Sequence, residues 1–122
     1  MGSDKYAPSS YSIADDMLQG RNRLRRKIAG ETYLLRFPFG TNGAETIKDS
    51  EIALHYYNTD IVLYNPDGSL SLNSGGYRTV TTKQRINWAL PQGWYLYQKD
   101  WEWFITQPDG TDIPFLDGMT VR

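Results

Sequence analysis

Two turn sequences of nearly the same composition constrain the fold of this 122-residue chain more than any other feature. They are Asn65-Pro66-Asp67-Gly68 and Gln107-Pro108-Asp109-Gly110. In each of them the proline presets one φ angle, the aspartate bonds to nearby backbone, and the glycine takes a positive φ angle. Segments with strand-like alternation lie on both sides of each turn. Both turns therefore predict β-hairpins.

From Thr32 onward, β-branched and aromatic residues recur with a period of two, which favours antiparallel strands. The predicted strands cover residues 31–37, 51–57, 59–64, 69–73, 77–80, 94–98, 101–106 and 111–115. Residues 58–60 predict a third tight hairpin, and residues 38–50 are expected to form the longest loop.

Two helices are expected beside these strands. Apolar residues recur at helical spacing over residues 12–28, which predicts an N-terminal helix that Gly20 weakens. Thr81 and Gln84 fit a capping box that opens a short helix at about residues 82–90. The predicted fold class is therefore α+β, mostly antiparallel β with these two helices.

Length and composition restrict the organisation of the chain. Residues 1–10 are expected to form a disordered tail, and residues 11–122 a single α+β domain. The absence of cysteine excludes disulfides and is typical of a reducing compartment. No apolar run approaches the roughly 20 residues of a membrane span, and no signal-peptide pattern is present. A cytoplasmic protein with no membrane partner is expected.

The sequence contains no recognisable catalytic set. His55 is the only histidine, and no nucleophile with a nearby base can be identified. A lone histidine without cysteine or a carboxylate cluster is a poor metal site. We therefore expect no enzymatic activity, no catalytic residue, no cofactor and no metal.

Residues 73–87 combine a double-glycine turn, hydroxyl groups and three cations. Free N–H groups at the start of the helix predicted there would attract an anion. The predicted ligand-binding residues are Gly75, Gly76, Tyr77, Arg78, Thr81, Thr82 and Lys83. The expected ligand is a phosphorylated small molecule, such as a cyclic nucleotide, with Tyr77 as a stacking ring. The alternative stays open that the threonines only cap the helix and that Lys83 is solvated.

Arg78 has two interpretations on the predicted strand 77–80. If Val80 faces the core, alternation half-buries Arg78 against an acidic or ligand partner. If Tyr77 faces the core instead, Arg78 points to solvent. The sequence does not decide between them.

Charge and aromatic residues suggest two further surfaces. The net charge is −1, yet residues 21–27 contain five cations, which form either a solvated face or a nucleic-acid contact. Aromatic residues between Trp94 and Phe104 fall on both faces of one hairpin. The second face favours a homo-oligomer, with a stacking platform for bases as the alternative.

Residues 58–62, 65–68 and 72–87, with the run Ser74-Gly75-Gly76-Tyr77-Arg78, resemble a widespread family of small proteins encoded by tailed phages. The resemblance covers about residues 27–90 and transfers no activity to individual residues. It implies a phage or prophage origin and action in the host cytoplasm.

Three functional hypotheses follow. The first is a non-enzymatic binding protein, an oligomeric sponge that sequesters a host nucleotide immune signal and so acts against host defence. The second is a nucleic-acid-associated accessory protein that uses residues 21–27 on phosphates. The third is an inhibitor of a host enzyme that binds through its aromatic face.

Overall fold

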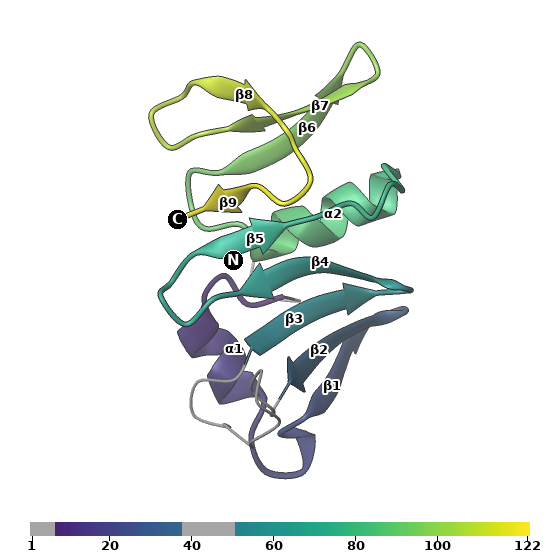
Figure 1. Cartoon of the computed structure of the whole chain (residues 1–122), viewed down its shortest axis with the longest axis vertical. Helices are drawn as coiled ribbons and strands as arrows, with labels where there is room; N and C mark the ends of the chain where they lie inside the picture. Colours follow the sequence, from purple (N-terminus) through teal and green to yellow (C-terminus); the bar gives the residue numbers. More distant parts are fainter. Residues whose placement is uncertain (1–6, 38–50) are drawn as a thin grey trace.

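The computed structural model describes residues 7–37 and 51–122, which form two antiparallel sheets with two α-helices (Figure 1). The larger sheet has six strands in the order β1-β2-β3-β4-β5-β9. These are β1 (Arg25–Ala29), β2 (Thr32–Phe37), β3 (Glu51–Tyr56), β4 (Thr59–Tyr64), β5 (Leu70–Leu72) and β9 (Thr120–Val121). The smaller sheet has the order β6-β7-β8. Its strands are β6 (Tyr95–Lys99), β7 (Glu102–Thr106) and β8 (Asp112–Pro114). The predicted α+β fold class is confirmed.

Both Pro-Asp-Gly turns close hairpins, as predicted. The N–H of Gly68 donates to the carbonyl of Asn65 at 2.9 Å, and the N–H of Gly110 donates to that of Gln107 at 2.8 Å. The first turn joins β4 to β5 and the second joins β7 to β8. Local turn chemistry therefore specifies one hairpin in each sheet.

The aspartates of these turns are also held alike. Asp67 accepts hydrogen bonds from the hydroxyl and N–H of Ser69, and Asp109 accepts the same pair from Thr111. These bonds lower the pKa of both carboxyls, and the bond from the hydroxyl has the largest effect. A lowered folded-state pKa stabilises the fold above the unfolded pKa of about 3.9. This contribution is lost as the pH falls through the lowered value.

The N-terminal helix is shorter than predicted. Helix α1 (Tyr11–Met17) is followed by a 3-10 turn, η2 (Gly20–Asn22), and residues 25–29 form β1, so the predicted helix over 12–28 is wrong. Gly20 has a φ of +61°, a left-handed conformation in which an α-helix cannot continue. Beyond it, the residues of β1 hydrogen-bond to β2 instead.

The predicted strand at 77–80 is also wrong. Helix α2 (Val80–Ala89) begins there, with Thr79 rather than Thr81 as its N-cap. Gly75 and Gly76 have φ values of +66° and +83°, so the chain turns straight into the helix. Val80 is 77% exposed, which removes the basis for alternation about a buried valine.

Residues 7–10, assigned above to a disordered tail, contribute to the core. Ala7 is fully buried, and the carbonyl of Pro8 accepts a hydrogen bond of 2.7 Å from the Tyr64 hydroxyl. Burial raises the pKa of the Tyr64 phenol, which favours the neutral form that donates this bond. Residues 1–6 and the loop predicted at 38–50 lie outside the described residues.

Helix α2 joins the two sheets through one core. It packs against β4 and against β6, and the buried cluster includes residues from both helices and both sheets. Its members include Ala14, Leu54, Ile86, Leu96 and Ile105. The position of α2 is therefore fixed from two sides.

A buried arginine attaches the N-terminal segment to the larger sheet. The Arg36 side chain is 1% exposed, and its Nη2 lies 2.6 Å from Oδ1 of Asp15. The same side chain donates to the carbonyls of Arg23 at 2.9 Å and Leu18 at 3.2 Å. One guanidinium thus holds α1 and the segment after η2 on β2.

Replacing Arg36 by leucine should lower the free energy of unfolding by about 2–4 kcal/mol, because the carbonyls it serves lose charged donors. Arg26→Leu is the matched control, because Arg26 is exposed and donates to the Met17 carbonyl at 3.2 Å. The control should change stability by less than about 1 kcal/mol. Urea unfolding measures both, and equal losses would contradict a structural role specific to Arg36.

Candidate ligand-binding site

A pocket of about 300 Å³ lies between the β3–β4 turn and the start of α2. Its lining combines tyrosine rings with hydroxyl and amide groups and contains no charged side chain. The lining residues are Tyr56, Tyr57, Asn58, Thr59, Ile61, Ser74, Tyr77, Thr79 and Thr82. Such a lining suits a planar ring that carries hydrogen-bonding groups.

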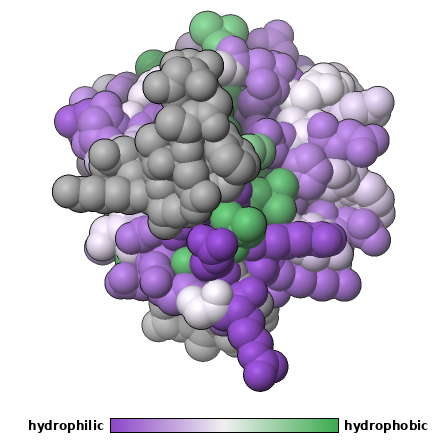
Figure 2. Space-filling view, turned by 60° about the horizontal axis from the view of Figure 1, so that its bottom comes forward, coloured by the Kyte–Doolittle hydropathy of each residue, from purple (hydrophilic) through white to green (hydrophobic). Residues whose placement is uncertain are grey.

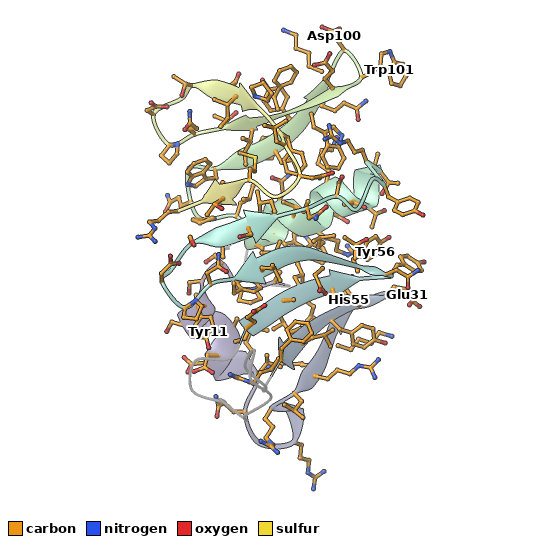
Figure 3. All side chains as sticks on the ribbon, viewed as in Figure 1. Tyr11, Glu31, His55, Tyr56, Asp100 and Trp101 are labelled. Atoms are coloured by element: carbon orange, nitrogen blue, oxygen red, sulfur yellow. The ribbon has the colours of Figure 1, made fainter. Side chains whose placement is uncertain are left out.

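Tyr57 stands at the rim of this pocket in an unfavourable backbone conformation. Its φ is +53°, which is uncommon for a bulky residue. The N–H of Tyr57 donates to the carbonyl of Glu31 at 3.2 Å, and its ring packs edge-on against Tyr56 with a centroid distance of 4.8 Å. Figure 3 shows Glu31 and Tyr56 at the same end of the sheet. These contacts hold the exposed Tyr57 ring at the rim.

The first turn of α2 forms another wall of the pocket. Oγ1 of Thr79 accepts a bond of 3.1 Å from the N–H of Thr82, and the two hydroxyls lie 3.0 Å apart. The N–H groups of Val80 and Thr81 have no carbonyl partner within the helix, since it starts there. The positive end of the helix dipole therefore lies next to the pocket.

The double-glycine turn uses its own donors. The N–H of Gly75 donates to Oδ1 of Asn73 at 2.7 Å, and the N–H of Gly76 donates to Oγ of Ser74 at 3.2 Å. Ser74 is buried and in turn donates to the Asp117 carboxylate through its N–H and hydroxyl. These backbone groups stabilise the turn rather than face a ligand.

The predicted cations do not line the pocket. The Arg78 guanidinium lies 5.5 Å from the ring centroid of Trp103 and 5.3 Å from that of Phe115. Arg78 is exposed, as in the solvent-facing interpretation, although Tyr77 is exposed as well instead of facing the core, and the guanidinium makes a cation–π contact with these two rings. Lys83 lines a separate hollow with Trp88, and Thr81 is half-exposed outside both linings.

The structure thus brings two predicted residues, Tyr77 and Thr82, to one pocket. Sequence reasoning missed the contribution of residues 56–59, although a hairpin with two adjacent tyrosines is a visible signal. Arg85, one of the three cations of residues 73–87, does lie near the pocket: its guanidinium is 5.8 Å from the Tyr56 ring centroid and donates to Thr32 at 3.0 Å. Arg85 places positive charge behind a ring of the lining.

The remaining chemistry of the described residues is limited. Nδ1 of His55 lies 2.7 Å from Oδ1 of Asp60, which fixes the ring. Residues 7–37 and 51–122 contain no group of three or more histidine, cysteine or acidic side chains that could hold a metal ion. Nor does any helix in this part of the chain have the length and apolarity to cross a membrane.

Comparison with known families places the chain among phage proteins. Residues 39–122 match the family described as Kyanoviridae Gp96 protein. Because the match spans more than half of the chain, the protein belongs to this family. The matched range includes the double-glycine turn, α2 and the whole smaller sheet. Neither the curated proteins nor the solved structures gave a match.

Gly75→Ala should destabilise the fold by about 2 kcal/mol or more, because a Cβ there would overlap the Thr59 side chain and the φ is positive. Gly76→Ala is the matched control, since its φ is also positive but no atom lies within 4 Å of the added Cβ. Only the backbone strain of about 1 kcal/mol should appear in the control. Thermal and denaturant unfolding compare the two, and equal losses would show that the contact with Thr59 does not constrain residue 75.

Proposed function

We propose that this phage protein is a non-enzymatic binding protein whose pocket takes a phosphorylated small molecule with an aromatic base. One observation carries the proposal: three tyrosine rings surround a pocket that opens at the positive end of α2. Rings accept a base, and a helix start accepts an anion. A nucleotide contains both groups in one molecule.

The size and chemistry of the pocket support a base. Its volume of about 300 Å³ is at the lower end of small-molecule sites. Tyr77 is 70% exposed, so its ring is available to close over a ligand. Asn58 and Thr59 supply an amide and a hydroxyl, which can bond to the polar edge of a base.

The start of α2 supports a phosphate. The free N–H groups of Val80 and Thr81 attract negative charge where the helix dipole is positive. Arg85 strengthens this field from behind Tyr56, whereas Arg78 and Lys83 act only from a distance. The phosphate is therefore expected outside the pocket mouth, near these backbone groups, because neither Val80 nor Thr81 lines the pocket itself.

Such a protein would act by sequestration inside the host cell, as a sponge for a nucleotide immune signal. Sequestration requires tight binding and no chemical step. This fits a lining in which no nucleophile has a general base beside it. Large exposed side chains on and near the smaller sheet support assembly of several copies. They are Trp101 and Leu116.

Calorimetry with a panel of cyclic and linear nucleotides tests the ligand. Tyr77→Ala should weaken binding about tenfold, because stacking of a base on an aromatic ring contributes about 1–3 kcal/mol. The matched control is Tyr95→Ala, an exposed tyrosine on β6 outside the pocket. The proposal fails if no nucleotide binds, or if both variants lose affinity equally.

Light scattering after gel filtration tests the assembly. The expected mass is a multiple of the 14.0 kDa chain, because exposed rings on a small chain favour burial between copies. The double variant Trp101→Ser, Leu116→Ser should lower that mass if these side chains form the interface. A monomer at all micromolar concentrations would remove the oligomeric sponge and leave the exposed rings for a partner protein.

A further inference from the structure

We propose that β1, β2 and the β3–β4 turn form a second binding surface, which takes single-stranded nucleic acid. This surface lies on the face of the larger sheet that does not carry the core. Arg25 and Lys27 pair across the sheet with Leu35 and Tyr33, and Tyr33 pairs with His55. Directly paired residues point to the same face, so these side chains lie together.

The opposite face confirms this division. Leu34 lies between Tyr33 and Leu35 on β2, and Leu54 precedes His55 on β3. Leu34, Leu54 and Ile52 point to the opposite face and are fully buried in the core. The strand period of two therefore places the cations and rings outside. In Figure 2, which views the end of the molecule that carries β1, long hydrophilic side chains lie beside a small apolar patch.

A hollow of about 450 Å³ marks the surface. Its lining residues are Arg25, Glu31, Tyr33, Leu35, His55 and Tyr57. Glu31 is the one carboxylate of this lining, and its negative charge repels an anion. Asp60 lies outside the lining and is bonded to His55. Figure 3 shows Glu31 and His55 at the same end of the sheet. The phosphates are therefore expected nearer to Arg25 than to Glu31.

Cations and rings alternate on this surface. The Arg25 guanidinium lies 4.2 Å from the centroid of the Tyr33 ring, and the Lys27 ammonium lies 6.0 Å from it. Tyr57 offers a second ring that is 62% exposed. Proteins that bind single strands use this combination, in which bases stack on rings while cations contact the backbone.

Edge protection alone does not explain the arrangement. β1 is an edge strand, and charged residues on an edge prevent pairing with other chains. That role requires no aromatic rings, yet Tyr33 and Tyr57 lie beside the cations, and Tyr57 is held with a positive φ. Rings can reach only unstacked bases, which favours a single strand over a duplex.

The cations extend beyond the hollow along the chain. Arg21 and Arg23 precede β1 and are exposed, so a strand that leaves the hollow would meet further positive charge. The whole chain has a net charge of −1, so attraction depends on this local cluster. Binding of this kind is expected to weaken steeply with salt.

This surface is separate from the pocket proposed above for a small ligand. The two linings share only Tyr57, and the pocket contains neither Arg25 nor Tyr33. A variant at Arg25 or Tyr33 can therefore lose nucleic-acid binding without losing nucleotide binding.

Fluorescence anisotropy with labelled oligo-dT and oligo-rU of about 15 nucleotides, and with a duplex of equal length, tests the proposal at several salt concentrations. The single strands should bind at low salt and more tightly than the duplex. The log–log salt slope should become shallower by about 1.4 in the Arg25→Ala, Lys27→Ala variant, about 0.7 for each lost phosphate contact.

Tyr33→Leu keeps an apolar side chain and should weaken single-strand binding about tenfold while leaving the salt slope unchanged. Lys99→Ala and Tyr95→Ala are matched controls on the smaller sheet and should have no effect. Absence of binding at about 50 mM salt, where phosphate contacts are strong, would overturn the proposal. The proposal would also be overturned if the duplex bound as tightly as the single strand and Tyr33→Leu left the affinity unchanged. That result would indicate attraction between charges alone. Nucleotide calorimetry on the Arg25 and Tyr33 variants separates this result from failure of the small-ligand site.

Discussion

The arrangement of the two sheets depends on the side chain of Asn87 in α2. Its Nδ2 donates to the carbonyl of Leu96 at 2.8 Å, and its Oδ1 accepts from the N–H of the same residue at 2.8 Å. The asparagine thus acts as a partner strand to the edge of β6 and satisfies backbone that would otherwise be buried without bonds. Because Ile86 and Ala89 are buried on the same helix, α2 is fixed to both sheets at once. The pocket at its N-terminus depends on that placement.

Local chemistry explains which elements could be predicted. The hairpins at residues 65–68 and 107–110 follow from turn residues that act within four positions, and the strand at 59–64 was predicted with the observed bounds. The helix expected at 12–28 failed because its second half pairs with β2, a contact that helical spacing does not encode. The two-residue strand β9 was missed, since its pairing with β5 joins segments far apart in sequence.

The candidate site shows the same limit. The sequence predicts a ligand-binding role for residues 73–87, but side chains from distant segments decide what each of these residues contacts. The Arg78 guanidinium lies against the rings of Trp103 in β7 and of Phe115, which follows β8. Ser74 is bonded to Asp117. Neighbouring side chains use the N–H groups of the double-glycine turn. Only the folded chain shows that the tyrosines of the β3–β4 turn complete the pocket.

Strained turns mark the ends of the molecule where rings are exposed. Glu31 and Tyr57 have φ values of +50° and +53°, and a backbone hydrogen bond joins the two residues. They lie between the proposed pocket and the proposed nucleic-acid surface. Asp100 and Trp101, with φ values of +52° and +69°, form the tip of the β6–β7 hairpin, far from them in Figure 3. Asparagine and glycine would suit such a two-residue turn better, and each bulky left-handed residue costs about 1 kcal/mol or more. Trp101 is 91% exposed, so its own packing does not offset that cost. Contact with another molecule would offset the cost. This tip is therefore where contact between copies is expected in the proposed assembly.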